Sequence, residues 1–350
     1  MKDGQARLLA VLSVIISGVV IFIFFGVSKA DFVGITEDKD AIPALAGVGL
    51  YDQMEELAED ERAEIEAEIR QYLRISLPEG TKESDIKIEP DYVKKQMHIE
   101  ITSKDKDYQL SKAMLGDCNH VTDISYGQEQ SVSFMDLTLD SVYEYEATTQ
   151  DKLLIVKFLK PKDVYDKVIV VDAGHGGSHP GTNRKEVLEK DLTLSIVLYL
   201  KELLDESDIK VYYTRTDDSN PGFDERVQLA NEIGADFFLS VHINADERSK
   251  QPNGTEALYY TQDTRSLEFA TICVNELSKA LNSKNRGVTS GDTIYIIHNS
   301  IVPVTLVEVG FLSNDAEFSQ LCSKQYQKKA AEGIYNGIVK AYEEMQGEKE

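Results

Sequence analysis

Four residues in the second half of the chain have the side chains needed to hold and use a metal ion. His175 follows the apolar run 168–171 in VVDAGHGG, and His242 ends another apolar run in SVHINA. Glu189 opens the helical pattern EKDLTL, and Glu308 lies within the apolar stretch VEVG. Two imidazoles and one carboxylate, with a fourth position left for water, form a common catalytic zinc site. A further carboxylate can then act as a general base on that water.

The elements around these residues predict an α/β fold. The glycines near His175 let the backbone turn sharply at the carboxyl end of a strand, which is where ligands bind in open α/β sheets. From Tyr165 onward, strand and helix patterns alternate, which predicts a twisted, mostly parallel or mixed β-sheet flanked by helices. Strands are expected at 167–172, 209–214, 236–244, 256–261 and 305–309, and helices at 190–204, 224–233, 267–281 and 325–345. At strand ends and a helix start, the four candidate residues can converge.

The N-terminal residues predict export. From Leu8 to Val27 the chain has no charged residue, and about 20 apolar residues are enough for a helix to cross a bilayer. Lys2 and Arg7 precede this run, so the positive-inside rule places the N-terminus in the cytoplasm. We therefore expect residues 1–30 to be a cytoplasmic stub and a transmembrane anchor, which makes the protein a single-pass protein of the cell membrane. The alternative is a signal peptide cleaved near Ala30, which would release a secreted protein.

Three further segments follow the anchor. Residues 31–80 are interpreted as a linker and an amphipathic helix over 51–73, ended by the Pro and Gly at 78–80. Residues 81–162 predict a small β-rich accessory module, and 163–350 predict the catalytic domain. The module's strands are expected at 86–88, 98–101, 131–134, 142–145 and 153–156.

Composition limits the choice of ligands. The net charge of −24 and a pI of about 4.7 argue against nucleic acid as a partner. Cys118, Cys273 and Cys322 are too few and too scattered for a disulfide framework or a cysteine-based zinc site. We expect buried free thiols at these three positions.

Several motifs together resemble one family of enzymes. The strings VVDAGHGG, EKDLTLSIVLYLKELL, ERVQLANEIGADFFLSVHINA, NGTEALYY and VPVTLVEVGFLSN are similar, in order and spacing, to the zinc-dependent N-acetylmuramoyl-L-alanine amidases. The similarity covers 168–342. It implies one Zn²⁺ ion bound by His175, Glu189 and His242, with Glu308 as the catalytic acid/base. It also implies hydrolysis of peptidoglycan between the lactyl group of N-acetylmuramic acid and L-alanine of the stem peptide.

Other residues near the motifs have less direct roles. Glu186 is the rival of Glu189 for the carboxylate ligand, although Lys190-Asp191 aligns better behind Glu189. Asp172 is expected to orient a metal-bound histidine. Asn244 and Arg226 are expected to be structural supports, Arg226 by pairing with a carboxylate. The two remaining histidines of this half, His179 and His298, are expected to be loop residues.

Two other functions fit some of the same residues. A zinc peptidase could cut within the stem peptide, and a non-catalytic wall-binding or regulatory protein could keep the fold without the activity. The second alternative usually loses a ligand or the base, whereas all four positions are filled here. The sequence identifies no activator and no partner in a wall complex.

Overall fold

The computed structural model describes residues 35–36, 63 and 66–345, and the chain divides into two compact units, Met1–Lys160 and Pro161–Glu350. The predicted membrane segment at 8–27 and nearly all of the predicted linker lie outside the described residues. No helix within the described part is both long enough and apolar enough to span a bilayer.

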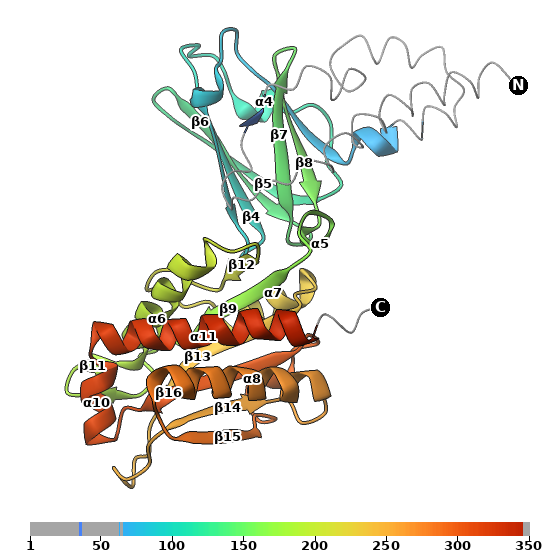
Figure 1. The fold of residues 1–350 in the computed structure, drawn as a ribbon. Helices are drawn as coiled ribbons and strands as arrows, with labels where there is room; N and C mark the ends of the chain where they lie inside the picture. The colour runs from blue at the N-terminus through green and yellow to red at the C-terminus, as the bar shows by residue number, and fades with distance from the viewer. Residues whose placement is uncertain (1–34, 37–62, 64–65, 346–350) are drawn as a thin grey trace, which may run out of the picture. The chain divides into compact units, whose positions relative to one another are not determined.

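The first unit is built from two four-stranded sheets, whose strands pair antiparallel except for β1 with β7. One sheet has the order β1-β7-β8-β2 and the other β3-β4-β6-β5 (Figure 1). Side chains from both sheets contribute to one apolar core. In β4, Met97, Ile99 and Ile101 are buried and alternate with partly exposed residues, as expected for a strand with one face in a core. The bounds are β1 Ile35–Thr36, β2 Tyr72–Ser76, β3 Ile86–Asp91, β4 Gln96–Thr102, β5 Val121–Glu129, β6 Val132–Leu139, β7 Glu144–Gln150 and β8 Leu153–Leu159, with the 3-10 helix η2 Glu83–Asp85 and the helix α4 Leu110–Ala113.

The predicted helix over 51–73 is wrong at its C-terminal end, and the β-rich unit begins before residue 81. Tyr72–Ser76 forms strand β2, which pairs antiparallel with β8. Both faces of β2 are buried, so its side chains do not alternate between apolar and polar. A short run of this kind has no period that separates a strand from a helix. Ile65, Ile69 and Leu73 are therefore spaced as in a helix, although Leu73 lies in a strand.

The second unit is organised around one mixed six-stranded sheet with the order β12-β9-β13-β16-β14-β15. The first four strands in this order are parallel, β14 runs antiparallel to β16, and β15 runs parallel to β14. The predicted α/β architecture is confirmed for this unit. The strand bounds are β9 Val168–Ala173, β12 Lys210–Tyr213, β13 Phe237–Asn244, β14 Thr255–Tyr259, β15 Asn285–Ser290 and β16 Val304–Phe311.

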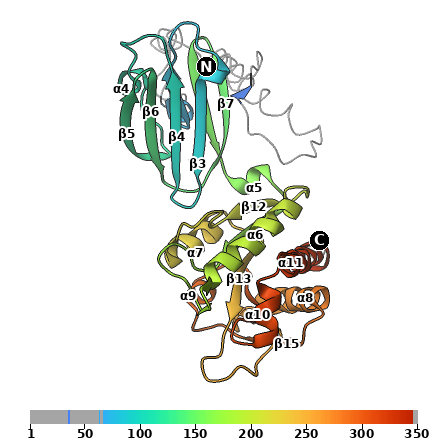
Figure 2. The same ribbon diagram turned by 90° about the vertical axis from the view of Figure 1, so that its left-hand side faces the viewer.

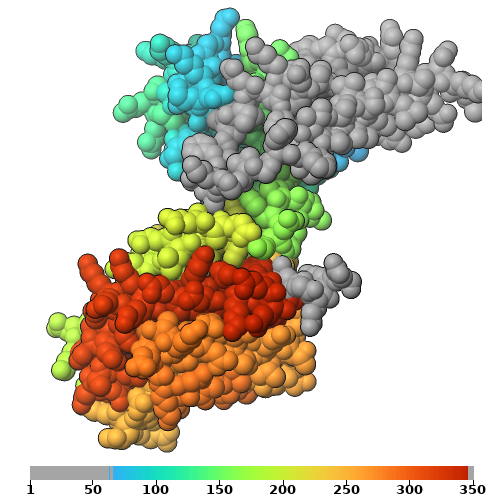
Figure 3. Space-filling view, in the orientation of Figure 1, coloured from blue at the N-terminus to red at the C-terminus, as the bar shows by residue number. Residues whose placement is uncertain are grey.

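Helices cover both faces of this sheet. Apolar side chains of α6, α8 and α11 form one core with Val171, Val241, Val307 and their neighbours on the strands. Helices α8 and α11 lie side by side in Figures 1 and 3, whereas α7 and α9 lie on the other side of the sheet in Figure 2. The helix bounds are α5 Pro161–Val164, α6 Glu189–Leu204, α7 Phe223–Glu232, α8 Thr264–Leu281, α9 Tyr295–His298, α10 Asp315–Leu321 and α11 Lys324–Met345.

This layering decides where the polar strand residues point. Val241 and Ile243 enter the core formed with α6, α8 and α11. Because successive side chains of a strand point to opposite faces, His242 points to the other face, toward the side of α7. The same alternation places Glu308 between Val307 and Val309 on the face opposite that core.

The cysteine prediction holds at two positions of three. Cys118 and Cys273 are buried and free, but Cys322 is exposed. Cys322 caps the C-terminus of the short helix α10, where the chain turns at the surface toward α11.

Candidate metal centre and active site

His175 lies on a tight loop directly after β9. Its φ is +63° and that of Gly176 is +135°, so the backbone turns here through conformations that favour glycine. Two cations hold the loop in place. Arg226 of α7 donates to the backbone carbonyl of His175 at 2.8 Å, and Lys190 Nζ donates to that of Gly177 at 2.8 Å. The imidazole is thereby held at the carboxyl end of the sheet with 30% of its side chain exposed.

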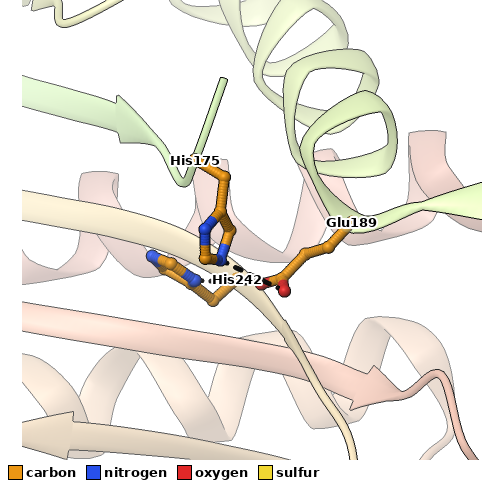
Figure 4. A group of neighbouring side chains, drawn as sticks. All are labelled: His175, Glu189 and His242. Atoms are coloured by element: carbon orange, nitrogen blue, oxygen red, sulfur yellow. Dashed lines mark hydrogen bonds and ion pairs between the residues drawn. The ribbon is translucent and has the colours of Figure 1, made fainter. Parts of the chain in front are cut away.

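Glu189 is the first residue of α6 and is almost completely buried. Its Oε1 lies 2.9 Å from His242 Nδ1, and its Oε2 lies 3.1 Å from His175 Nε2 (Figure 4). Backbone amides fix both oxygens, since Thr182 donates to Oε2 at 2.8 Å and Ile243 donates to Oε1 at 3.0 Å. Burial raises the pKa of this carboxyl, but the two histidines outweigh burial and hold the pKa well below its ordinary value.

His175, Glu189 and His242 form a group in which the ligand atoms all lie within 4.8 Å of one another. Two imidazole nitrogens and one carboxylate oxygen are a donor set that suits zinc. Two glycines pack so closely against this group that any side chain there would collide with the ligands. A Cβ added at Gly181 would lie 2.4 Å from Glu189 Oε2, and one at Gly174 would lie 2.4 Å from His242 Nε2. The three residues therefore fit a bound divalent metal ion.

Glu308 lies beside this group in the middle of the sheet. In the strand register it stands opposite His242 on β13 and opposite Glu256 on β14. Its Oε2 is buried and has no hydrogen-bond partner among the described residues. Burial, together with the carboxylates of Glu189 and Glu256, raises the pKa of Glu308 well above its ordinary value. A buried carboxyl without a partner is costly, and such groups cluster at functional sites.

The predicted supporting residues lie around the metal group, but Asp172 has a different partner from the histidine that was expected. Asp172 does not bond to a histidine ring. Its carboxylate accepts hydrogen bonds from Arg226, from Thr214 Oγ1 at 2.6 Å and from Ser240 Oγ at 2.5 Å. Asp172 thus orients His175 only through Arg226, because that guanidinium also holds the His175 carbonyl. Arg226 pairs with a carboxylate, as predicted.

Asn244 lies two residues beyond His242, at the end of β13. Its side-chain amide donates to Glu256 Oε1 at 2.6 Å, and Arg286 Nε donates to Glu256 Oε2 at 3.1 Å. Asn244 thereby holds the carboxylate that stands opposite Glu308.

The rival residues lie outside the metal group. Glu186 is exposed on the turn between the short strands β10 (Asn183–Arg184) and β11 (Val187–Leu188). His179 is exposed in the loop after Gly177, and its Nδ1 lies 2.9 Å from the side-chain amide of Asn220. His298 is exposed at the end of α9 and contacts the ring of Tyr260.

Sequence reasoning missed Arg215, which lies just after β12. This buried guanidinium donates to the carbonyls of Ala173, Gly174 and Lys190 at 2.8–2.9 Å and so ties the His175 loop to the start of α6. The signal that could have found it is an arginine directly after an apolar strand. Sequence reasoning also missed Glu256, whose signal is a carboxylate within the motif NGTEALYY.

Comparisons with known proteins identify relatives of the second unit. A family described as N-acetylmuramoyl-L-alanine amidase matches residues 169–340. Two curated relatives come from Bacillus subtilis (strain 168). The uncharacterized protein YqiI is 33% identical over 180 residues, covering 51% of this chain and 86% of that protein. The germination-specific N-acetylmuramoyl-L-alanine amidase is 32% identical over 192 residues, covering 51% of this chain and 81% of that protein.

Solved structures include the catalytic domain of CwlV, an N-acetylmuramoyl-L-alanine amidase from Bacillus (Paenibacillus) polymyxa var. colistinus. It has a TM-score of 0.48 and 32% sequence identity, and the match covers 51% of this chain and 98% of that chain. The family match and the two relatives lead to one conclusion: the chain belongs to the N-acetylmuramoyl-L-alanine amidase family.

Proposed function

We propose that this chain hydrolyses peptidoglycan at the amide bond between the lactyl group of N-acetylmuramic acid and L-alanine of the stem peptide. His175, Glu189 and His242 hold one zinc ion, and Glu308 is the catalytic acid/base. One observation carries this proposal. In a chain of the amidase family, three residues from a loop, a helix start and a strand bring their ligand atoms within 4.8 Å, beside a buried carboxyl on the next strand.

Each residue has a defined part in the reaction. When bound, zinc supplies a cation that polarises the substrate carbonyl and makes water acidic enough to attack near neutral pH. The bound cation would also favour the ionised form of Glu308, which can then accept the proton of the attacking water. Its Oε2 has no other partner among the described residues. Glu308 then delivers that proton to the leaving nitrogen of L-alanine. Glu189, fixed by two backbone amides, would hold its carboxylate beside both imidazoles, where all three can bind the same ion.

The test is hydrolysis of purified glycan carrying stem peptides, followed by mass spectrometry. We expect free stem peptides with a new L-alanine amino terminus, lost with a chelator and restored by zinc. Glu308→Gln should bind zinc normally and lose at least about a hundredfold in kcat, the low end for general acid–base catalysis. Glu186→Gln is the matched control, because this exposed carboxylate lies outside the site, and it should keep full activity. Substantial turnover by the Glu308→Gln enzyme would refute its role.

The same experiment separates the alternatives. Cuts within the peptide would show that the chain is a zinc peptidase and not an amidase. Binding of one zinc ion and of glycan without any cut would favour a wall-binding or regulatory protein.

We further propose that residues 8–27 anchor the protein in the cell membrane with the catalytic unit on the outer side. The uncharged apolar run and the preceding Lys2 and Arg7 support this proposal. Fractionation of cells that express the full chain should find it in the membrane pellet. A protein released into the medium with Asp31 as its first residue would instead establish a cleaved signal peptide.

A further inference from the structure

A pocket of about 590 Å³ opens at the end of the sheet that carries the metal group. Three loops line it: residues 181–184 before the β10–β11 turn, residues 245–250 after β13, and Ser313 after β16. In Figure 1 this end of the unit is marked by β11 and α10. Arg184 pairs with Asp315, the first residue of α10. The volume falls within the range of roughly 300–1,000 Å³ that is typical of small-ligand sites.

This pocket shares a wall with the metal group. The Thr182 amide donates to Glu189 Oε2 at 2.8 Å, and Gly181 is so close that an added Cβ would lie 2.6 Å from the His175 ring. Residues 245–250 begin three positions after His242. A ligand that fills the pocket therefore lies next to the residues that would hold the metal ion.

The lining is polar and carries cations. It contains no aromatic side chain and no aliphatic side chain larger than that of alanine. Most of its charges already have partners within the fold. Arg184 donates to the carbonyls of Leu312 and Ser313, at 3.1 and 3.2 Å. Lys250 lies 3.5 Å from Asp315.

Arg248 differs from the other two cations of the pocket, Arg184 and Lys250. Asp246 Oδ1 accepts the backbone amides of Arg248 and Ser249, at 2.8 and 3.1 Å, and so fixes the turn that presents the Arg248 side chain. The guanidinium itself forms no hydrogen bond or ion pair with the described residues, and it is exposed. A free guanidinium is well suited to bind a carboxylate through two parallel hydrogen bonds.

We propose that this pocket receives the stem peptide, and that Arg248 binds a free carboxylate on it. The inference rests on the proposed amidase function, which places the peptide on one side of the metal group and the glycan on the other. The glycan is the poorer fit, because sugar rings offer apolar faces that stack on aromatic side chains, and this pocket has none. In a chain with a net charge of −24, a local cation is also needed to offset the repulsion of an acidic peptide.

The test uses the zinc-loaded full chain and two muropeptides that differ at one group. One has a free α-carboxylate at the second residue of the stem, and the other has a primary amide there. The wild type should prefer the acid. Arg248→Ala should lose about tenfold in kcat/KM on the acid, mainly through a higher KM, and little on the amide. Arg248→Lys should recover part of the loss, because it keeps the charge without the two-pronged geometry.

Arg265→Ala is the matched control, because it removes an exposed arginine at the start of α8, outside the pocket. It should leave the KM for the acid unchanged. Calorimetric binding of the two free stem peptides gives a readout independent of hydrolysis. Equal cleavage and equal binding of acid and amide by wild type and Arg248→Ala would overturn the pocket assignment. Preferential binding of the acid without cleavage of either muropeptide would support the pocket and overturn the amidase proposal.

Discussion

At the scale of single residues, the buried ion pair of Asp172 and Arg226 supports the metal site, because Arg226 also holds the backbone carbonyl of His175. Both side chains are nearly inaccessible to solvent, at 1% and 3% exposed. Removing one partner of such a pair leaves the other charge buried and uncompensated. We expect Asp172→Asn to lower the free energy of unfolding of the second unit by about 3–5 kcal/mol at neutral pH. Asp205→Asn, which breaks an exposed pair with Lys201, should cost far less.

The effect of Asp172→Asn should depend on pH. Burial alone would raise the pKa of Asp172, but Arg226 and the hydroxyls of Ser240 and Thr214 outweigh it and hold the pKa below its ordinary value of 3.8. A depressed pKa stabilises the fold above the unfolded value, and this contribution is lost as the pH falls through the folded value. The difference between wild type and variant should therefore shrink below about pH 4, by up to about 1.4 kcal/mol per pH unit. Hydrogen exchange of β9 in increasing urea, at pH 7 and pH 3, measures it. A difference that stays constant between these pH values would contradict this account.

The residues of the site were more predictable than their partners. His175, His242 and Glu308 stand out because a polar side chain at the end or in the middle of an apolar strand is costly without a function. The partner of Asp172 was not predictable in the same way. Arg226 lies 54 positions away, and only the packing of α7 on the sheet brings it to that carboxylate. Arg215 was missed for the same reason, since it binds three carbonyls from two other elements.

At the scale of elements, the loop that leads into α6 can pack against the metal ligands because Gly181 has no side chain. Gly181 has φ of +69°, and an added Cβ would lie 2.4 Å from Glu189 Oε2 and 2.6 Å from the His175 ring. Gly181→Ala should therefore displace these ligands and weaken zinc binding by at least about tenfold. The control is Gly287→Ala, because Gly287 has a similar φ of +80° but open space around it. The Gly287→Ala variant carries the same backbone strain, of about 1 kcal/mol, and should bind zinc normally. Titration of the metal-free chains with zinc gives the comparison, and equal affinities would show that the loop adapts to the added methyl group.

Most long periodic elements followed from the sequence, and several short ones did not. The nine-residue strand β5 (VTDISYGQE) is an exception, missed because its mostly exposed side chains do not alternate between apolar and polar. The strands β9, β13 and β16 and the helices α6, α7 and α11 lie within one or two residues of the predicted bounds. The α9 and α10 helices and the edge strand β15 were missed, since four to seven residues carry too little periodicity to be recognised. β2 was taken for part of a helix because burial on both faces removed its alternation.

At the scale of the whole molecule, the residues that the structure describes form two separate apolar cores, one in each unit. The metal group lies wholly in the second unit, on the loop after β9, on α6 and on β13. A ligand that binds only the folded state stabilises it according to its concentration relative to Kd, by about 2.7 kcal/mol at a hundredfold excess over Kd. The stabilisation by zinc should therefore be confined to the unit that holds it.

Removal of the metal tests this division. We expect a chelator to speed hydrogen exchange in β9 and β13 of the full chain, because opening of the second unit no longer has to release zinc. Exchange in β4 and β6 of the first unit should stay unchanged, since their core contains no residue of the metal group. Addition of zinc to wild type should restore protection, whereas addition to a His242→Ala chain should not. Loss of protection in both units on chelation would show that the two units unfold together, and protection unaffected in either would show that the metal contributes nothing to the fold.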